Sequence, residues 1–216
     1  MSSIEQLLKD LDESNIELSK TLFAIRSALT VYGVVGLNAS KIEVGNRFFG
    51  FVQGQQVDLI AVGFSKIFEK ERKYRLNSIQ SILQFVEKNN INPTNSRAVS
   101  DYLARWNVEK RKSWALDLRV LLDNQYKKHK KNILRIKEVR DTQIAHSQAG
   151  TPKKDLPSIA VFEELLKIAC EFHDFVNSAF LNTSSRPILT DTQVQISLVK
   201  LFREIGLSDV ITTFPD

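Results

Sequence analysis

Apolar residues recur at intervals of three and four along most of the chain, and this spacing predicts helices rather than strands. Only eight Gly and five Pro interrupt the 216 residues, so long intervals contain no helix breaker. We therefore expect an all-α fold. The predicted elements are a short helix that turns near Glu13, a longer one that ends between Gly33 and Gly36, and helices over about 42–69, 77–91, 95–112, 114–148, 158–182 and 191–205.

Polar residues mark where several of these helices begin. Ser3 with Gln6, and Ser14 with Glu17, have the spacing of a capping box, in which each side chain satisfies a backbone N–H of the other residue. Asn77 is expected to cap the helix that stops before Pro93. At the other end of the chain, Gly206 is expected at the C′ position of the last helix.

The segment from about Ile42 to Glu69 is apolar on nearly every side, as expected of a central helix that its neighbours bury. Glycines lower the stability of a helix interior, because they gain more freedom on unfolding than other residues. We therefore expect close helix contacts or a kink near Gly54 in this segment, which contains Gly45, Gly50, Gly54 and Gly63.

Composition favours a single domain over residues 1–216, large enough to fold without disulfides or metals. The only cysteine, Cys170, excludes a disulfide framework and favours a reducing compartment. The first twenty residues mix acidic and basic side chains, unlike a secretory signal, and no uninterrupted apolar run approaches the roughly 18 residues of a membrane span. We expect a cytoplasmic protein with no membrane partner.

Arg140 interrupts an apolar helix face. At about 100° per residue, it falls inside the sector formed by Ile133, Ile136 and Val139, while His146 lies at the edge of that sector. A charged group on a core-facing stripe needs a partner or a cleft, because burying it unpaired is costly. The stripe therefore opens into a water-filled groove or meets another helix that carries complementary groups.

The stretch Arg140–His146 resembles the signature of the HEPN superfamily, an Arg and a His separated by four to six residues, often with a polar residue after the Arg. Here Asp141 is that polar residue. The chain also resembles the AbiU-type, abortive-infection branch of this superfamily. The similarity lies in the residues that lead into and close the stretch, in the apolar helix from Asp58 to Phe68 and in the helix start at Ser78. The layout is similar over about residues 15–182, which leaves an extra N-terminal helix and a C-terminal extension over 183–216.

The resemblance implies an up-and-down helical bundle that dimerises so that two motif helices face each other. Active members are metal-independent endoribonucleases of the toxin and phage-defence kind, so the implied site needs no cofactor and no metal. Arg140 and His146 would form the catalytic pair with Asp141 assisting, and an antitoxin protein is a candidate partner. His can transfer a proton near neutral pH, and Arg can hold a phosphate.

Positive charge concentrates just before this motif. The net charge of the chain is +5, and between Tyr126 and Asp141 seven Lys and Arg residues are opposed only by Glu138. Such a cluster attracts phosphates without sequence preference, and salt weakens the attraction. The predicted RNA-binding residues are Lys127, Lys128, Lys130, Lys131 and Lys137.

Plainer interpretations remain open for each of these features. The alternative to the ribonuclease is a non-catalytic helical module that binds a protein or nucleic acid, with Arg140 paired to an acid on a neighbouring helix and the lysines on a solvated face. His129, flanked by lysines, is expected to be exposed. Trp106 and Trp114, eight residues apart, are expected to share one helix face in the core. Three scattered His and one Cys lack the spacing of a zinc site.

Overall fold

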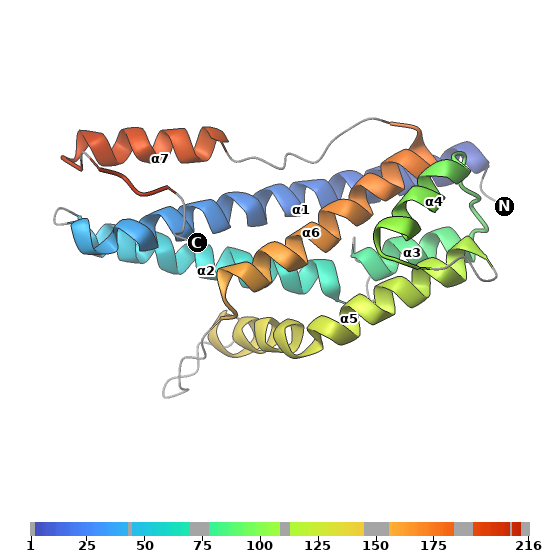
Figure 1. Cartoon of the computed structure of the whole chain (residues 1–216), viewed down its shortest axis with the longest axis horizontal. Helices are drawn as coiled ribbons and strands as arrows, with labels where there is room; N and C mark the ends of the chain where they lie inside the picture. Colours follow the sequence, from blue (N-terminus) through green and yellow to red (C-terminus); the bar gives the residue numbers. More distant parts are fainter. Residues whose placement is uncertain are drawn as a thin grey trace.

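The structure, a computed structural model of the chain, describes residues 3–42, 45–69, 78–108, 113–144, 156–183, 192–207 and 209–212, without the side chains of 143 and 144. The secondary structure of these residues is helical, which confirms the all-α class (Figure 1). The elements are α1 (Ile4–Asn38), the 3₁₀ turn η1 (Ala39–Lys41), α2 (Asn46–Phe68), α3 (Ile79–Lys88), α4 (Ser96–Arg105), α5 (Trp114–Val139), η2 (Arg140–Ile144), α6 (Ile159–Val176), η3 (Asn177–Leu181) and α7 (Thr192–Glu204).

α1 is one continuous helix of 35 residues, so the predicted turn near Glu13 is wrong. The Ser14 hydroxyl donates to the Asp10 carbonyl at 2.9 Å inside the helix instead of starting a new one. The predicted cap at Ser3 is confirmed, because its hydroxyl accepts from the Gln6 backbone N–H at 3.2 Å. By length and composition the span Ile4–Lys41, which contains α1, could cross a membrane, and 44% of its most apolar window is buried within the bundle.

α1 and α2 form a long hairpin (Figure 1). The two helices come close together at Gly63. A Cβ added there would lie 2.5 Å from Ile25 Cγ1, a distance that leaves no room for a side chain. The predicted close contact is therefore present, but at Gly63 rather than Gly54, because nothing in the structure lies within 4 Å of a Cβ at Gly54.

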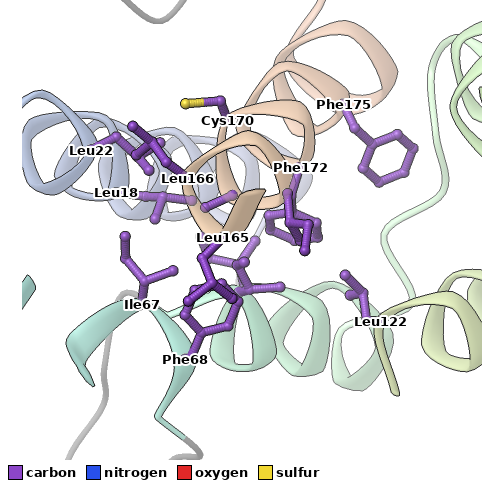
Figure 2. Close-up of a cluster of buried hydrophobic side chains, with 14 of the residues drawn as sticks. Leu18, Leu22, Ile67, Phe68, Leu122, Leu165, Leu166, Cys170, Phe172 and Phe175 are labelled. Atoms are coloured by element: carbon purple, nitrogen blue, oxygen red, sulfur yellow. The ribbon is translucent and has the colours of Figure 1, made fainter. Parts of the chain in front are cut away.

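The main core lies where α1, α2, α5 and α6 meet. Figure 2 shows Leu18 of α1, Ile67 of α2, Leu122 of α5 and Leu165 of α6 converging on one cluster. Aromatic rings extend the cluster, since Phe64 of α2 stacks on Phe162 of α6 with centroids 5.2 Å apart. Apolar burial on this scale is the main force that holds the four helices together.

The described residues leave one face of α2 exposed, which contradicts the prediction that neighbours bury this helix on nearly every side. Phe48, Phe51, Leu59 and Val62 are between 44% and 65% exposed. Phe48 and Val62, together with the exposed Gln55 between them, follow one another at seven-residue spacing, which keeps them on one side of the helix. We refer to Phe48, Phe51, Gln55, Leu59 and Val62 as the α2 stripe.

The C-terminal helix α7 packs on the far end of the α1–α2 hairpin (Figure 1). Phe202 of α7 is fully buried and its ring lies 5.1 Å from that of Phe49. This small second cluster also contains Val34, Val35 and Ile42. Gly206 has φ +94° and follows the helix as predicted for its C′ position. Part of the extension beyond residue 182 is thus built into the bundle.

Side-chain caps mark the starts of α3, α4 and α5. Ser78 caps α3 by accepting from the Ser81 backbone N–H at 3.2 Å, whereas Asn77, the predicted cap, lies outside the described residues.

The two tryptophans do not share one helix face as predicted, because Trp106 follows α4 and Trp114 begins α5. Both are half-buried and pack against the main core, which confirms their structural role.

Candidate functional site

The helix that carries Arg140 changes its hydrogen-bonding pattern at that residue. α5 ends at Val139, and Arg140–Ile144 form η2, a π-helical turn, where the sequence predicts α-helix to about residue 148. Hydrogen bonds in a π turn span five residues, so the turn is wider than an α-helical one. Such turns are rare and concentrate at functional sites. The direction of the motif side chains therefore differs from that in an ideal α-helix.

Two carboxylates hold Arg140. Its Nη1 donates to Glu69 Oε2 at 2.9 Å, and its Nε donates to Asp141 Oδ1 at 2.8 Å. The Arg140 side chain is 24% exposed, and that of Glu69 is 30% exposed. Partial burial by itself lowers the pKa of the Arg140 guanidinium, but the hydrogen bonds from Asp141 and Glu69 outweigh burial and raise the pKa overall. The guanidinium stays charged, and its plane is fixed from two sides.

The ion pair with Glu69 is the kind of partner that the helical pattern predicts for Arg140. A charged side chain on an apolar stripe requires a partner, and Glu69, directly after α2, supplies it. This contact is also the one expected of a purely structural arginine. A guanidinium has five N–H groups, however, and the two carboxylates leave Nη2 without a partner among the described residues.

Glu69 is the site residue that the sequence does not predict. It stands 71 residues before Arg140, and the only available signal is an acidic residue directly after the last apolar position of a predicted helix. Glu69 also lies seven residues after Val62, so it continues the line of the α2 stripe. The exposed apolar face of α2 therefore leads to the Arg140 site.

The other motif residues are placed only in part. Asp141 is 56% exposed and holds its neighbour Arg140, while the Thr142 hydroxyl donates to the Glu138 carbonyl at 2.7 Å within the helix. His146 lies outside the described residues, as does the segment 70–77 after Glu69, whose sequence contains Lys70, Arg72, Lys73 and Arg75. The structure therefore brings Arg140, Asp141 and Glu69 together.

The predicted RNA-binding lysines do not form one group around Arg140. Lys127, Lys128, Lys130 and Lys131 are exposed, and Lys137 is half-buried. Lys131 lines a groove of about 690 Å³ together with Arg135 and with Leu156 before α6, whereas Arg140 turns toward the end of α2. Lys128 pairs instead with Glu164 at 2.5 Å. Phosphates drawn to these lysines would thus meet α5 on more than one side.

His129 is buried at 4% exposure, so the prediction that its lysine neighbours keep it exposed is wrong. Its Nε2 lies 3.5 Å from Glu164 Oε1 across the α5–α6 contact. Burial is the main cause that lowers the pKa of His129, opposed by Glu164. His129 lies four residues before Ile133, which is one helical turn, so the helical period alone would have placed it on the core-facing side.

Two further groups that could carry chemistry are structural. Cys170 is buried, and burial raises the pKa of its thiol to about 11, so the reactive thiolate is not populated near neutral pH. His173 is buried in a network in which Asn15 donates to Asn177 at 2.8 Å, and the Asn177 amide lies 3.4 Å from the imidazole. Within the described residues no group of His, Cys, Asp and Glu is arranged to hold a metal ion.

Comparison with known proteins identifies the family. The model of AbiU2, a HEPN family, matches residues 9–196, a range wider than the 15–182 expected from the layout. No curated protein and no solved structure matches the chain. The matched range contains the whole Arg140–His146 motif, Glu69 and all of α2 to α6. The chain belongs to the AbiU2 family of HEPN proteins.

Proposed function

We propose that this protein is a metal-independent endoribonuclease of the HEPN defence type, working in the cytoplasm as a homodimer. The observation that carries the proposal is the Arg140 guanidinium, which is charged, held by Glu69 and Asp141, and has no acceptor for Nη2 among the described residues. A planar cation fixed in this way suits the non-bridging oxygens of a phosphodiester. Membership of a HEPN family and the presence of His146 six residues further on support the same chemistry.

The reaction requires one base, one acid and a counter-charge. The ribose 2′-OH attacks phosphorus after giving its proton to a base, and the leaving 5′-oxygen takes a proton from an acid. The products are a 2′,3′-cyclic phosphate and a 5′-OH, and the need for the 2′-OH restricts the substrate to RNA. We assign the proton transfers to His146 and the stabilisation of the pentavalent phosphorane to Arg140.

Two copies of the chain would supply both the acid and the base. A single His cannot be protonated and deprotonated at the same moment, whereas a composite cleft holds one His from each copy. The α2 stripe supports this arrangement, because its exposed apolar side chains end at Glu69, next to Arg140. Exposed apolar faces of this kind commonly mark protein interfaces.

The direct test is cleavage of RNA by the purified protein in excess EDTA. Wild type is expected to cut single-stranded RNA and leave 2′,3′-cyclic phosphate ends, while a DNA of the same sequence stays intact. His146→Ala is expected to reduce the rate by about 10²–10⁴-fold, the usual contribution of general acid–base catalysis. Equal rates for wild type and His146→Ala, or cleavage only with added metal, would contradict the proposal.

A second expected result concerns the dimer. Val62→Arg places a charge on the α2 stripe seven residues before Glu69, and we expect sedimentation equilibrium to change from twice 24.6 kDa to 24.6 kDa. Val120→Arg is the matched control, since Val120 is a similarly exposed valine on α5. If wild type already sediments as a monomer, or if both variants behave alike, the α2 stripe is not the interface.

The alternative is a non-catalytic helical module that uses the same face to bind a protein, such as an antitoxin, or nucleic acid. One observation favours it: Arg140 already forms an ion pair with Glu69 within one chain, as a purely structural arginine would. This alternative predicts RNA binding without turnover. It also predicts that substitution of Lys127 or Lys131, both exposed on α5, weakens binding more than substitution of His146.

A further inference from the structure

We propose that Glu69 is a positioning residue for the reaction, which sets the plane of the Arg140 guanidinium so that Nη2 is presented to the scissile phosphate. This inference rests on the proposed ribonuclease function and adds a residue from outside the motif. Its basis is the pair of hydrogen bonds that reach Arg140 from two different places, Asp141 on the same turn and Glu69 at the end of α2.

The two carboxylates engage different parts of the guanidinium. Asp141 accepts from Nε and Glu69 accepts from Nη1, so rotation about the bond between Nε and Cζ is opposed at both ends. Among the described residues, both N–H groups of Nη2 and one N–H of Nη1 remain without an acceptor. N–H groups held in one plane in this way can donate to the oxygens of a phosphate.

Without Glu69, η2 alone would have to hold the guanidinium. Asp141 is adjacent in sequence and more than half exposed, so it restrains Arg140 less than a partner on a separate helix does. Glu69 is anchored by α2, whose last residues Ile67 and Phe68 are buried in the main core. The position of the cation is thus tied to the rigid bundle, and rate depends steeply on such positioning.

If the Arg140–Glu69 ion pair only stabilised the fold, its removal would change the stability of the protein and not specifically the reaction rate. Both side chains are partly exposed, and pairs of that kind add little to folding stability. Glu87 provides a matched comparison, because it also joins an arginine of α5, Arg119, to another helix, but far from the motif. If Glu69 were merely structural, Glu69→Gln and Glu87→Gln would have the same consequences.

The test is a double-mutant cycle on RNA cleavage in EDTA. Glu69→Ala is expected to lower kcat by on the order of 10- to 100-fold with little change in KM, and Glu69→Gln, which keeps an acceptor oxygen, to fall between. In an Arg140→Ala background Glu69→Ala is expected to change nothing, because Glu69 acts only through Arg140. Glu87→Gln should leave kcat unchanged, and all variants should melt within the same narrow range. A loss that persists in the Arg140→Ala background, or none in wild type, overturns the inference.

A second measurement separates this inference from the ribonuclease proposal. In protein labelled with ¹⁵N-arginine, we expect the Arg140 guanidinium to rotate slowly about the bond between Nε and Cζ, giving separate Nη signals that merge in Glu69→Gln but not in Glu87→Gln. Separate signals in a protein without RNA cleavage would leave the positioning intact and refute the ribonuclease. Merged Nη signals in wild type would refute the positioning whether or not RNA is cut.

Discussion

Arg140→Ala is expected to lower kcat for RNA cleavage by about 10²–10³-fold, the cost of removing one group that stabilises a developing oxyanion. The extra negative charge of the phosphorane exists only in the transition state, so KM should change less than kcat. Arg140→Lys should recover little of the loss, because an ammonium cannot donate to two carboxylates and a phosphate in one plane, as the guanidinium can.

The control for this experiment is Arg119→Ala. Arg119 also lies on α5 and also pairs with a glutamate of another helix, Glu87, so its removal costs a comparable ion pair. The kcat of Arg119→Ala is expected to equal that of wild type. If Arg119→Ala and Arg140→Ala lose the same activity, the arginines of α5 act through the stability of the helix rather than through the phosphate.

Gly63→Ala is expected to destabilise the protein by about 1–3 kcal/mol, although alanine is the better helix former by about 1 kcal/mol. The new methyl group would lie 2.5 Å from Cγ1 and 2.8 Å from Cδ1 of Ile25, so the buried Ile25 side chain or the spacing of α1 and α2 must change. Urea unfolding followed by far-UV circular dichroism, at one fixed protein concentration, measures the change.

Gly54→Ala is the same substitution in the same helix without a neighbour. None of the described residues lies within 4 Å of a Cβ at Gly54, so alanine should stabilise α2 by about 0.5–1 kcal/mol. Opposite signs for the two variants would establish that the contact at Gly63, and not glycine in general, brings α1 and α2 together. Stabilisation by both would show that the hairpin tolerates a wider spacing.

Helical periodicity predicts most of the fold and the position of Arg140, because both depend on spacing within one segment. It places Arg140 on the core-facing side of its helix, and the structure confirms that the side chain is largely covered and paired. It would also have predicted the burial of His129, had the four-residue spacing to Ile133 been weighed above the charge of the flanking lysines. Local pattern was the stronger signal in both cases.

What the sequence does not predict depends on contacts between distant segments. Glu69 meets Arg140 because α2 ends beside η2, and no spacing rule links residues 71 positions apart. The bare face of α2 is missed for a related reason, since apolar residues such as Phe51 and Val62 show that burial is favourable but not whether this chain has a neighbour to provide it.

At the π turn Arg140–Ile144, the number of residues between two positions no longer gives the angle between them around the helix axis, as it does in an α-helix. A π turn contains one residue more than the α-helical turn it replaces, so it behaves as an insertion absorbed without a loop. In this chain the number of residues after Arg140 therefore does not fix the angle through which the helix has turned. A deletion within η2 that restored α-helical bonding would leave Arg140 in place beside Glu69 and rotate everything that follows it.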